Sequence, residues 1–98
     1  MQYIIRAYDG PGMLEKRLAV RQRHLENIGR VKGKILCAGG LLDGNGEMKG
    51  SVLVMEFANR ELLEEYLESE PYRKEQVWEH VEVEPVNIVI LDGEKVGK

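Results

Sequence analysis

KILCAGGLLDGNGEMKGSVLVMEF, residues 34–57, decides the fold because it predicts two adjacent antiparallel strands. KILCAGGLL is an apolar run of strand length, and SVLVMEF, residues 51–57, is rich in β-branched and large apolar residues. DGNG, residues 43–46, is a strong hairpin signal, because Asp-Gly and Asn-Gly pairs suit the tight turns between such strands. The stretch therefore predicts a β-hairpin.

The segment before this hairpin predicts a strand followed by a helix. QYIIRAY, residues 2–8, is rich in β-branched and aromatic residues and ends at the turn signal DGPG. A helix is expected from about Met13 to Lys32, where Gly29 and Gly33 favour fraying and a C-terminal stop.

The segment after the hairpin predicts a second helix and a last strand. Asn59 can accept an orphan backbone N–H and so cap the helix RELLEEYLES, which ends at Glu70-Pro71-Tyr72. VWEHVEVEPVNIVIL, residues 77–91, predicts a long strand. The parity of its apolar residues shifts at Pro85, which indicates a bulge or bend there.

The order β-α-β-β-α-β predicts an α+β protein of the ferredoxin-like type, in one domain over residues 1–98. Two right-handed crossovers place the first and third strands in the centre of a four-stranded antiparallel sheet, with both helices on one face. Residues 51–57 direct large apolar side chains to both faces, yet the helices cover only one. Because a bare apolar face costs about 25 cal/mol per Å² in water, we expect a homodimer packed sheet against sheet.

The composition is that of a soluble globular protein and argues against several partners. The 98 residues are 43% hydrophobic and 32% charged, with a net charge of −3, so no basic footprint for nucleic acid is present. No apolar run approaches the roughly 20 residues of a membrane span, and the N-terminus lacks a signal-peptide pattern. A cytoplasmic location is therefore the default expectation.

The sequence offers few residues for disulfide formation or metal binding. Cys37 is the one cysteine, which excludes an internal disulfide, and it is expected to behave as a small buried hydrophobe. His24 and His80 show none of the spacings typical of metal-binding motifs, so no metal site is expected. His80 belongs to a strand face that is expected to be solvated or intersubunit.

The first helix carries an unusual charge in its apolar stripe. On a helical wheel, Leu14, Leu18, Leu25 and Ile28 fall within an arc of about 80°. Arg21 lies inside that arc, whereas Arg17 and His24 lie just outside its edge. Arg21 could lay its aliphatic stem across the core edge and reach water. If it is buried, it needs an anion, and Asp9 at the end of the first strand is the natural partner.

Asp9 and His24 together suggest proton chemistry. A carboxylate that holds one ring nitrogen fixes the tautomer and leaves the other as a general base near neutral pH. Arg17 and Arg21 beside this pair could bind an anionic or enolic molecule and stabilise developing negative charge. The alternative is that Asp9 only neutralises Arg21 and the cluster is structural.

The segments YIIRAYDGPG, EKRLAVRQRHL, CAGGLL, GSVLVMEF, SEPY and WEHVEVEPV resemble the YciI-like (YCII-related) family over nearly the whole chain. The resemblance implies the dimeric α+β barrel fold group and an active site built around His24 and Asp9, with Arg17 and Arg21 matching the family pattern. Related sequences have been linked to elimination chemistry on chlorinated aromatics. The chain has Ala38-Gly39-Gly40 where many relatives have AGP, and Glu70-Pro71-Tyr72 where many have DPY.

These observations favour a small homodimeric enzyme that needs no cofactor and acts by elimination or isomerisation on a small anionic or enolisable molecule. His24 would move a proton, Asp9 would orient it, and Arg17 and Arg21 would bind the anion. Ser51 could hydrogen-bond a ligand and Tyr72 could form a wall of the cleft, although both residue types are more often structural in such places. Two alternatives remain: a small-ligand-binding or regulatory module that uses the same cleft without turnover, and a structural accessory domain.

Overall fold

The computed structural model describes residues 1–98, and its elements follow the predicted order with additional short ones. In chain order the elements are β1 Gln2–Asp9, α1 Leu14–Ile28, β2 Lys34–Leu42, β3 Met48–Glu56, α2 Arg60–Ser69, α3 Pro71–Lys74, β4 Trp78–Val86, β5 Ile90–Leu91 and β6 Glu94–Lys95.

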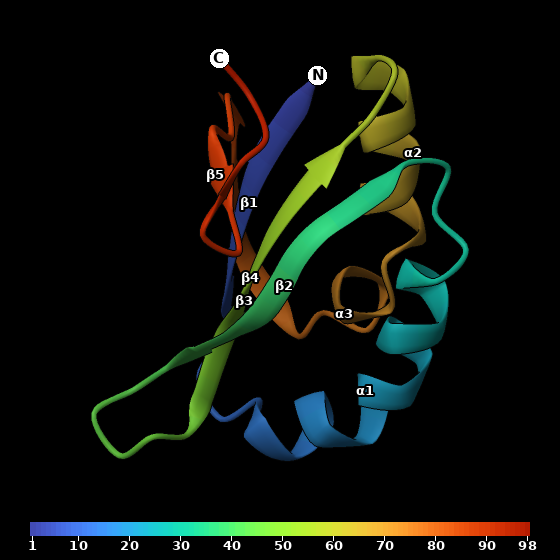
Figure 1. Cartoon of the computed structure of the whole chain (residues 1–98). Helices are drawn as coiled ribbons and strands as arrows, with labels where there is room; N and C mark the ends of the chain where they lie inside the picture. The colour runs from blue at the N-terminus through green and yellow to red at the C-terminus, as the bar shows by residue number, and fades with distance from the viewer.

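The four long strands form one antiparallel sheet in the order β2-β3-β1-β4. The first and third strands are therefore central, as two right-handed crossovers require. All three helices lie on one side of the sheet (Figure 1). The fold is α+β and ferredoxin-like, which confirms the prediction from the order of the elements.

The hairpin predicted at residues 43–46 is formed by local hydrogen bonds. Asp43 Oδ1 accepts the backbone N–H groups of Asn45 and Glu47 at 2.8 and 3.0 Å. Gly46 has a φ of 78°, which a residue without Cβ adopts at no steric cost. The connection between β2 and β3 extends beyond the helical layer (Figure 1).

The core lies between the helices and the facing side of the central strands. Tyr3, Ile5 and Ala7 of β1 are all buried, so the predicted strand parity is correct. Side chains from β3, α2 and β4 complete the core, among them Leu53, Met55, Leu63, Leu67 and Val77.

The predicted apolar stripe of α1 is displaced from the face that is buried. The buried residues of this helix are Arg17, Val20 and His24. Leu18 and Leu25 are 53% and 43% exposed, although they define the stripe on a helical wheel. The prediction was wrong because it treated arginine and histidine as polar, whereas here they turn inward to partners on β1 and α2–α3. The helix also ends at Ile28, four residues before the expected end.

The predicted long last strand is two separate pieces. β4 ends at Val86, and residues 90–95 form a small hairpin, β5–β6, around Asp92 and Gly93. These two residues have φ angles of 52° and 75°, as a two-residue hairpin turn requires. Asp92-Gly93 is an Asp-Gly pair typical of such turns, so the prediction of one continuous strand was wrong. The bulge predicted at Pro85 is also absent, because Pro85 pairs with Tyr3 in regular register on an edge strand that tolerates its missing N–H, and the register shift of β4 lies between Trp78 and His80.

The second face of the sheet carries no helix. Ile4, Val52 and Val54 point to this side, with the ion pairs of Arg6 with Glu82 and Glu84 beside them. The C-terminal hairpin lies on this side as well (Figure 1), where the backbone N–H of Ile88 donates to Gln2 Oε1. No helix is long and apolar enough to cross a membrane, and the location of the chain in the cell stays a prediction.

We expect Gly50→Ala to lower the free energy of unfolding by about 1–3 kcal/mol. A Cβ at this position would fall on the Ala7 carbonyl oxygen of the neighbouring central strand, which cannot move without breaking the sheet. Urea unfolding followed by circular dichroism measures the change. Gly44→Ala is the matched control, because a Cβ there meets nothing within 4 Å. Equal stability of the two variants would contradict the prediction.

Candidate active site

A cavity of about 150 Å³ lies between α1 and the sheet, on the side of edge strand β2. Five of the six predicted site residues line it: Arg17, Arg21, His24, Ser51 and Tyr72. Asp9 does not line the cavity, but it is hydrogen-bonded to Arg17, which does. The residues therefore converge from α1, β3 and α3, elements that are distant in sequence.

The wall formed by β2 contributes almost no side-chain bulk. Ala38, Gly39 and Gly40 line the cavity, and the Met48 side chain lies over Gly40. A Cβ on Gly40 would meet the Met48 sulfur at 2.9 Å, so this glycine makes room for the thioether. The cavity therefore has an apolar wall on β2 opposite the polar side chains of α1.

Asp9 forms a buried ion pair with Arg17. Arg17 Nε donates to Asp9 Oδ2 at 2.5 Å, and Arg17 Nη2 donates to Asp9 Oδ1 at 3.0 Å and to Ser51 Oγ at 2.7 Å. Both charged side chains are less than 5% exposed. The expectation that Asp9 pairs with Arg21 was wrong, because the buried face of α1 carries Arg17 four residues earlier.

Arg21 is the cavity arginine that has no carboxylate partner. It lines the cavity from an exposed position on α1, whereas the charge of Arg17 is matched by Asp9. A partly exposed, unmatched guanidinium is well suited to bind an anion, because it gives up little hydration and no existing ion pair.

His24 is held by Glu70 and not by Asp9. The distance from His24 Nδ1 to Glu70 Oε1 is 2.6 Å, and the Glu70 side chain is fully buried. The predicted hydrogen bond between Asp9 and His24 is therefore wrong, although the principle of a carboxylate behind the imidazole is retained. Sequence reasoning missed Glu70 because it took the Glu70-Pro71-Tyr72 segment as a helix break and a family motif and gave the Glu70 side chain no role at the site.

The surroundings of Glu70 determine which ring nitrogen of His24 is basic. Tyr66 Oη donates to Glu70 Oε2 at 2.5 Å, and the backbone N–H of Tyr72 donates to Glu70 Oε1 at 3.1 Å. Both oxygens of Glu70 accept hydrogen bonds from these neighbours, so Glu70 faces His24 as an acceptor and His24 Nδ1–H is the donor. His24 Nε2 is then the unprotonated nitrogen, and it has no partner in the chain.

Aromatic rings fix the plane of this imidazole. The His24 ring stacks on Tyr72 with centroids 4.2 Å apart, and the Arg17 guanidinium lies 4.4 Å from the same Tyr72 centroid. Trp78 meets His24 edge-on, and its buried indole N–H has no partner. Burial raises the pKa of Tyr72 above its usual value, while the charges of Arg17 and Arg21 oppose that rise. Tyr72 therefore stays a neutral phenol at neutral pH.

The other two residues considered in the sequence lie outside this arrangement. Cys37 is exposed on β2, so its expected burial was wrong. His80 is an exposed residue of β4 that stacks on Tyr8. No group of three or more His, Cys, Asp or Glu side chains is arranged to hold a metal ion.

The YCII-related domain family matches residues 1–87. The chain is 36% identical over 93 residues to Protein YciI of Escherichia coli O6:H1, covering 87% of this chain and 95% of that protein. An uncharacterized protein of Haemophilus influenzae is 33% identical over the same shares. Among solved structures, the chain is similar to 5-chloro-2-hydroxyhydroquinone dehydrochlorinase from Burkholderia phenoliruptrix AC1100, in complex with 2,5-dihydroxybenzoquinone. The TM-score is 0.81 and the identity 27%, covering 88% of this chain and 93% of that one.

We expect Asp9→Asn to lower the free energy of unfolding by about 3–5 kcal/mol, because it leaves the Arg17 guanidinium buried without a counter-charge. Thermal and urea unfolding at pH 7 measure this loss. Glu84→Gln, which removes an exposed partner of Arg6, is the control and should cost less than about 1 kcal/mol. A mild effect of Asp9→Asn, similar to that of the control, would show that the pair is not buried in solution.

Proposed function

Because the chain belongs to the YCII-related domain family, we propose that it is a cofactor-independent enzyme that transfers a proton on a small anionic or enolisable molecule, by elimination or isomerisation. The observation that carries this proposal is the orientation of His24. Its Nδ1 is held by the buried carboxylate of Glu70, and the residue lines a cavity that also holds the unmatched charge of Arg21.

The chemistry of imidazole supports the role of His24 as a base. A neutral imidazole is the side chain best suited to accept a proton at physiological pH. Its second nitrogen has no partner in the chain, so a ligand hydroxyl can occupy that position. The negative charge that develops on the ligand after proton removal would be stabilised by Arg21, which lines the same cavity.

The size of the cavity favours a single-ring substrate. A volume of about 150 Å³ accommodates one six-membered ring. The similar Burkholderia protein is a dehydrochlorinase of a chlorinated trihydroxybenzene and was solved with a dihydroxybenzoquinone. We therefore choose a chlorinated hydroxyhydroquinone as the substrate class to test first.

Elimination from such a ring requires only what the cavity supplies. His24 Nε2 takes the proton of one ring hydroxyl and returns it to the ring carbon that bears chlorine, which gives a keto tautomer. His24 Nε2 then takes the proton of a second ring hydroxyl, and the electron pair of that O–H bond moves through the ring and expels chloride. The net change is the loss of HCl with formation of a quinone. The protonated His24 then returns its proton to solvent, so no redox partner is consumed.

The remaining predicted residues have supporting roles in this proposal. Asp9 acts by fixing Arg17, whose guanidinium forms one side of the cavity beside Ser51. The Tyr72 ring stacks on His24 and holds it in place. The Tyr72 hydroxyl stays protonated, so it can donate a hydrogen bond to a ligand oxygen.

We expect His24→Gln to reduce kcat for chloride release from 5-chloro-2-hydroxyhydroquinone by at least about 100-fold, the usual contribution of a general base. A chloride electrode and the absorbance of the quinone product follow the reaction. The control is Arg23→Gln, because Arg23 lies on the same helix but pairs with Glu75 away from the cavity. Undiminished turnover in His24→Gln would remove His24 from the mechanism. Binding of 2,5-dihydroxybenzoquinone by the unaltered protein without turnover of any related substrate would favour the ligand-binding module.

The functional unit in this proposal is a homodimer packed through the open face of the sheet. Ile4 and Val52 are partly exposed there and form an apolar strip with Val54, which is 8% exposed in the single chain, and no helix of the same chain covers this strip. Burial of this strip against a second copy would be favourable by about 25 cal/mol for each Å² of apolar surface.

We expect light scattering after size-exclusion chromatography to report twice the mass of the chain at micromolar concentration. Val52→Glu should shift the protein towards the monomer, because it places a charge in the centre of the apolar strip. Leu18→Glu is the control, since Leu18 is exposed on α1 on the opposite side of the sheet. A folded monomer of the unaltered chain would contradict the proposed assembly.

A further inference from the structure

We propose that Tyr66 is a positioning residue that sets the protonation state of His24 through Glu70. The inference rests on the proposed function only in taking His24 as the base, and the contacts that support it are independent of any substrate. Tyr66 lies on α2, outside the lining of the candidate site, and takes part in none of the proposed proton-transfer steps.

Tyr66 supplies the hydrogen bond to the outer oxygen of the Glu70 carboxylate. Its hydroxyl donates to Glu70 Oε2 at 2.5 Å, whereas His24 Nδ1 and the Tyr72 N–H both bind Oε1. Tyr66 is 3% exposed and Glu70 is fully buried, so water does not replace this donor. The phenol remains a donor, since burial and the negative charge of Glu70 raise the pKa of Tyr66 far above its usual value.

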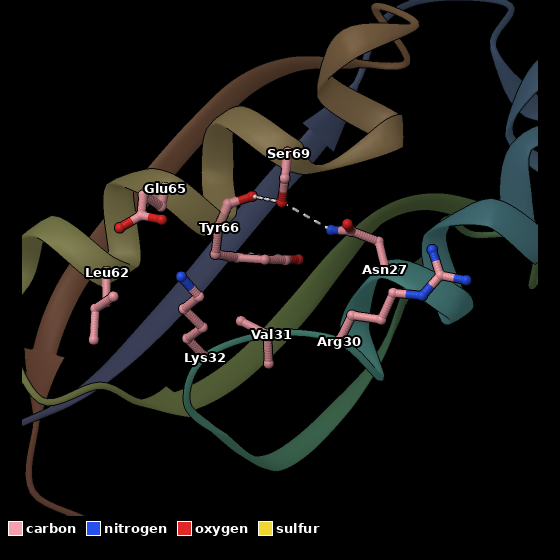
Figure 2. A pocket seen from close by; sticks show the side chains of 8 residues that line it. All are labelled: Asn27, Arg30, Val31, Lys32, Leu62, Glu65, Tyr66 and Ser69. Atoms are coloured by element: carbon pink, nitrogen blue, oxygen red, sulfur yellow. Dashed lines mark hydrogen bonds between the residues drawn. The ribbon is translucent and has the colours of Figure 1, made fainter.

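A second chain of hydrogen bonds holds Tyr66 against the helix that carries His24. Asn27 Nδ2 donates to Ser69 Oγ at 3.0 Å, and Ser69 Oγ donates to the Tyr66 carbonyl oxygen at 2.7 Å. Figure 2 shows the Tyr66 ring extending from α2 toward α1, beside this chain. Asn27 lies one turn after His24 on α1. The Tyr66 carbonyl is thus connected to α1 through Ser69 and Asn27. The Tyr66 hydroxyl is connected to the same helix through Glu70 and His24.

The Tyr66 ring also lines a second cavity of about 180 Å³, which shares no residue with the candidate site. This cavity lies between the end of α1 and α2, with Arg30 and Lys32 on its rim (Figure 2). The Tyr66 side chain therefore lies between this second cavity and Glu70, and its hydroxyl donates to the Glu70 carboxylate. Tyr66 therefore acts on His24 through Glu70, although Tyr66 does not line the ligand cavity.

The electrostatic consequence has a definite sign. A donor on Oε2 draws negative charge away from Oε1, so it weakens the attraction of Glu70 for a protonated His24. Removal of the donor should therefore favour the imidazolium. The other groups that face His24 are the Tyr72 ring, the Trp78 indole and the cations Arg17 and Arg21, and they are unchanged by a substitution at Tyr66.

The test is Tyr66→Phe, which removes one oxygen and keeps the ring. We expect the midpoint of the His24 titration, followed by ¹⁵N and ¹H NMR of the imidazole, to move up by about one pH unit relative to the unaltered protein. Tyr3→Phe is the matched control, because Tyr3 is equally buried in the same aromatic cluster but makes no hydrogen bond to Glu70. This control should leave the midpoint unchanged.

An unchanged or lowered midpoint in Tyr66→Phe, with folding intact, would overturn the proposal. If the variant does not fold, the unaltered protein decides the question: a downfield, slowly exchanging Tyr66 hydroxyl proton together with the Nδ1–H tautomer of His24 supports it, and the absence of either overturns it. Neither measurement uses a substrate. A shifted midpoint combined with full turnover in His24→Gln would therefore retain the role of Tyr66 and reject the proposed function.

Discussion

The buried carboxylate of Glu70 is the group on which the arrangement of the helical layer depends. A fully buried anion is tolerated only when hydrogen bonds replace its hydration, and here three donors from α1, α2 and α3 do so. Each donor fixes the element that carries it. The His24 bond orients α1, the Tyr66 bond fixes the end of α2, and the bond that Glu70 accepts from the Tyr72 N–H caps the start of α3. The orientation of a candidate base and the packing of the helices thus result from the same contacts.

The two arginines of the site differ in whether their charge is already paired. Arg17 and Asp9 neutralise each other in the interior and connect α1 to β1 and, through Ser51, to β3. Burial makes that pair rigid but leaves it little capacity to attract an anion. Arg21, one turn later, is on the surface side of the same helix and has no counter-charge. A ligand charge placed near Arg21 would therefore be the missing partner, whereas one placed near Arg17 would compete with Asp9.

The sequence predicted the topology well because strand order, turn residues and hydrophobic alternation are local signals with few alternatives. Asp43 and Gly46 identified the hairpin, and Tyr3, Ile5 and Ala7 the core face of β1. The pairing of side chains was predicted less well. A helical wheel places Arg21 in the apolar stripe, but the buried face of α1 is defined by Arg17 and His24, whose partners on other elements no periodicity reveals. Glu70 was present in a recognised motif, yet its burial depends on three contacts distant along the chain. Five of the six residues singled out in the sequence line one cavity, and only the fold determined that Glu70, and not Asp9, contacts His24.

The bare wall of the cavity has a consequence for how this site can change over time. The candidate base and its supports lie on the packed elements, whereas Ala38, Gly39 and Gly40 belong to an edge strand that is largely exposed. A side chain added at Gly39 meets nothing within 4 Å. A substitution at Gly39 would therefore change the wall of the cavity at little cost to the packed core. The molecule that fits the cavity can thus change through this strand, while the contacts that hold His24 on the packed elements stay constant.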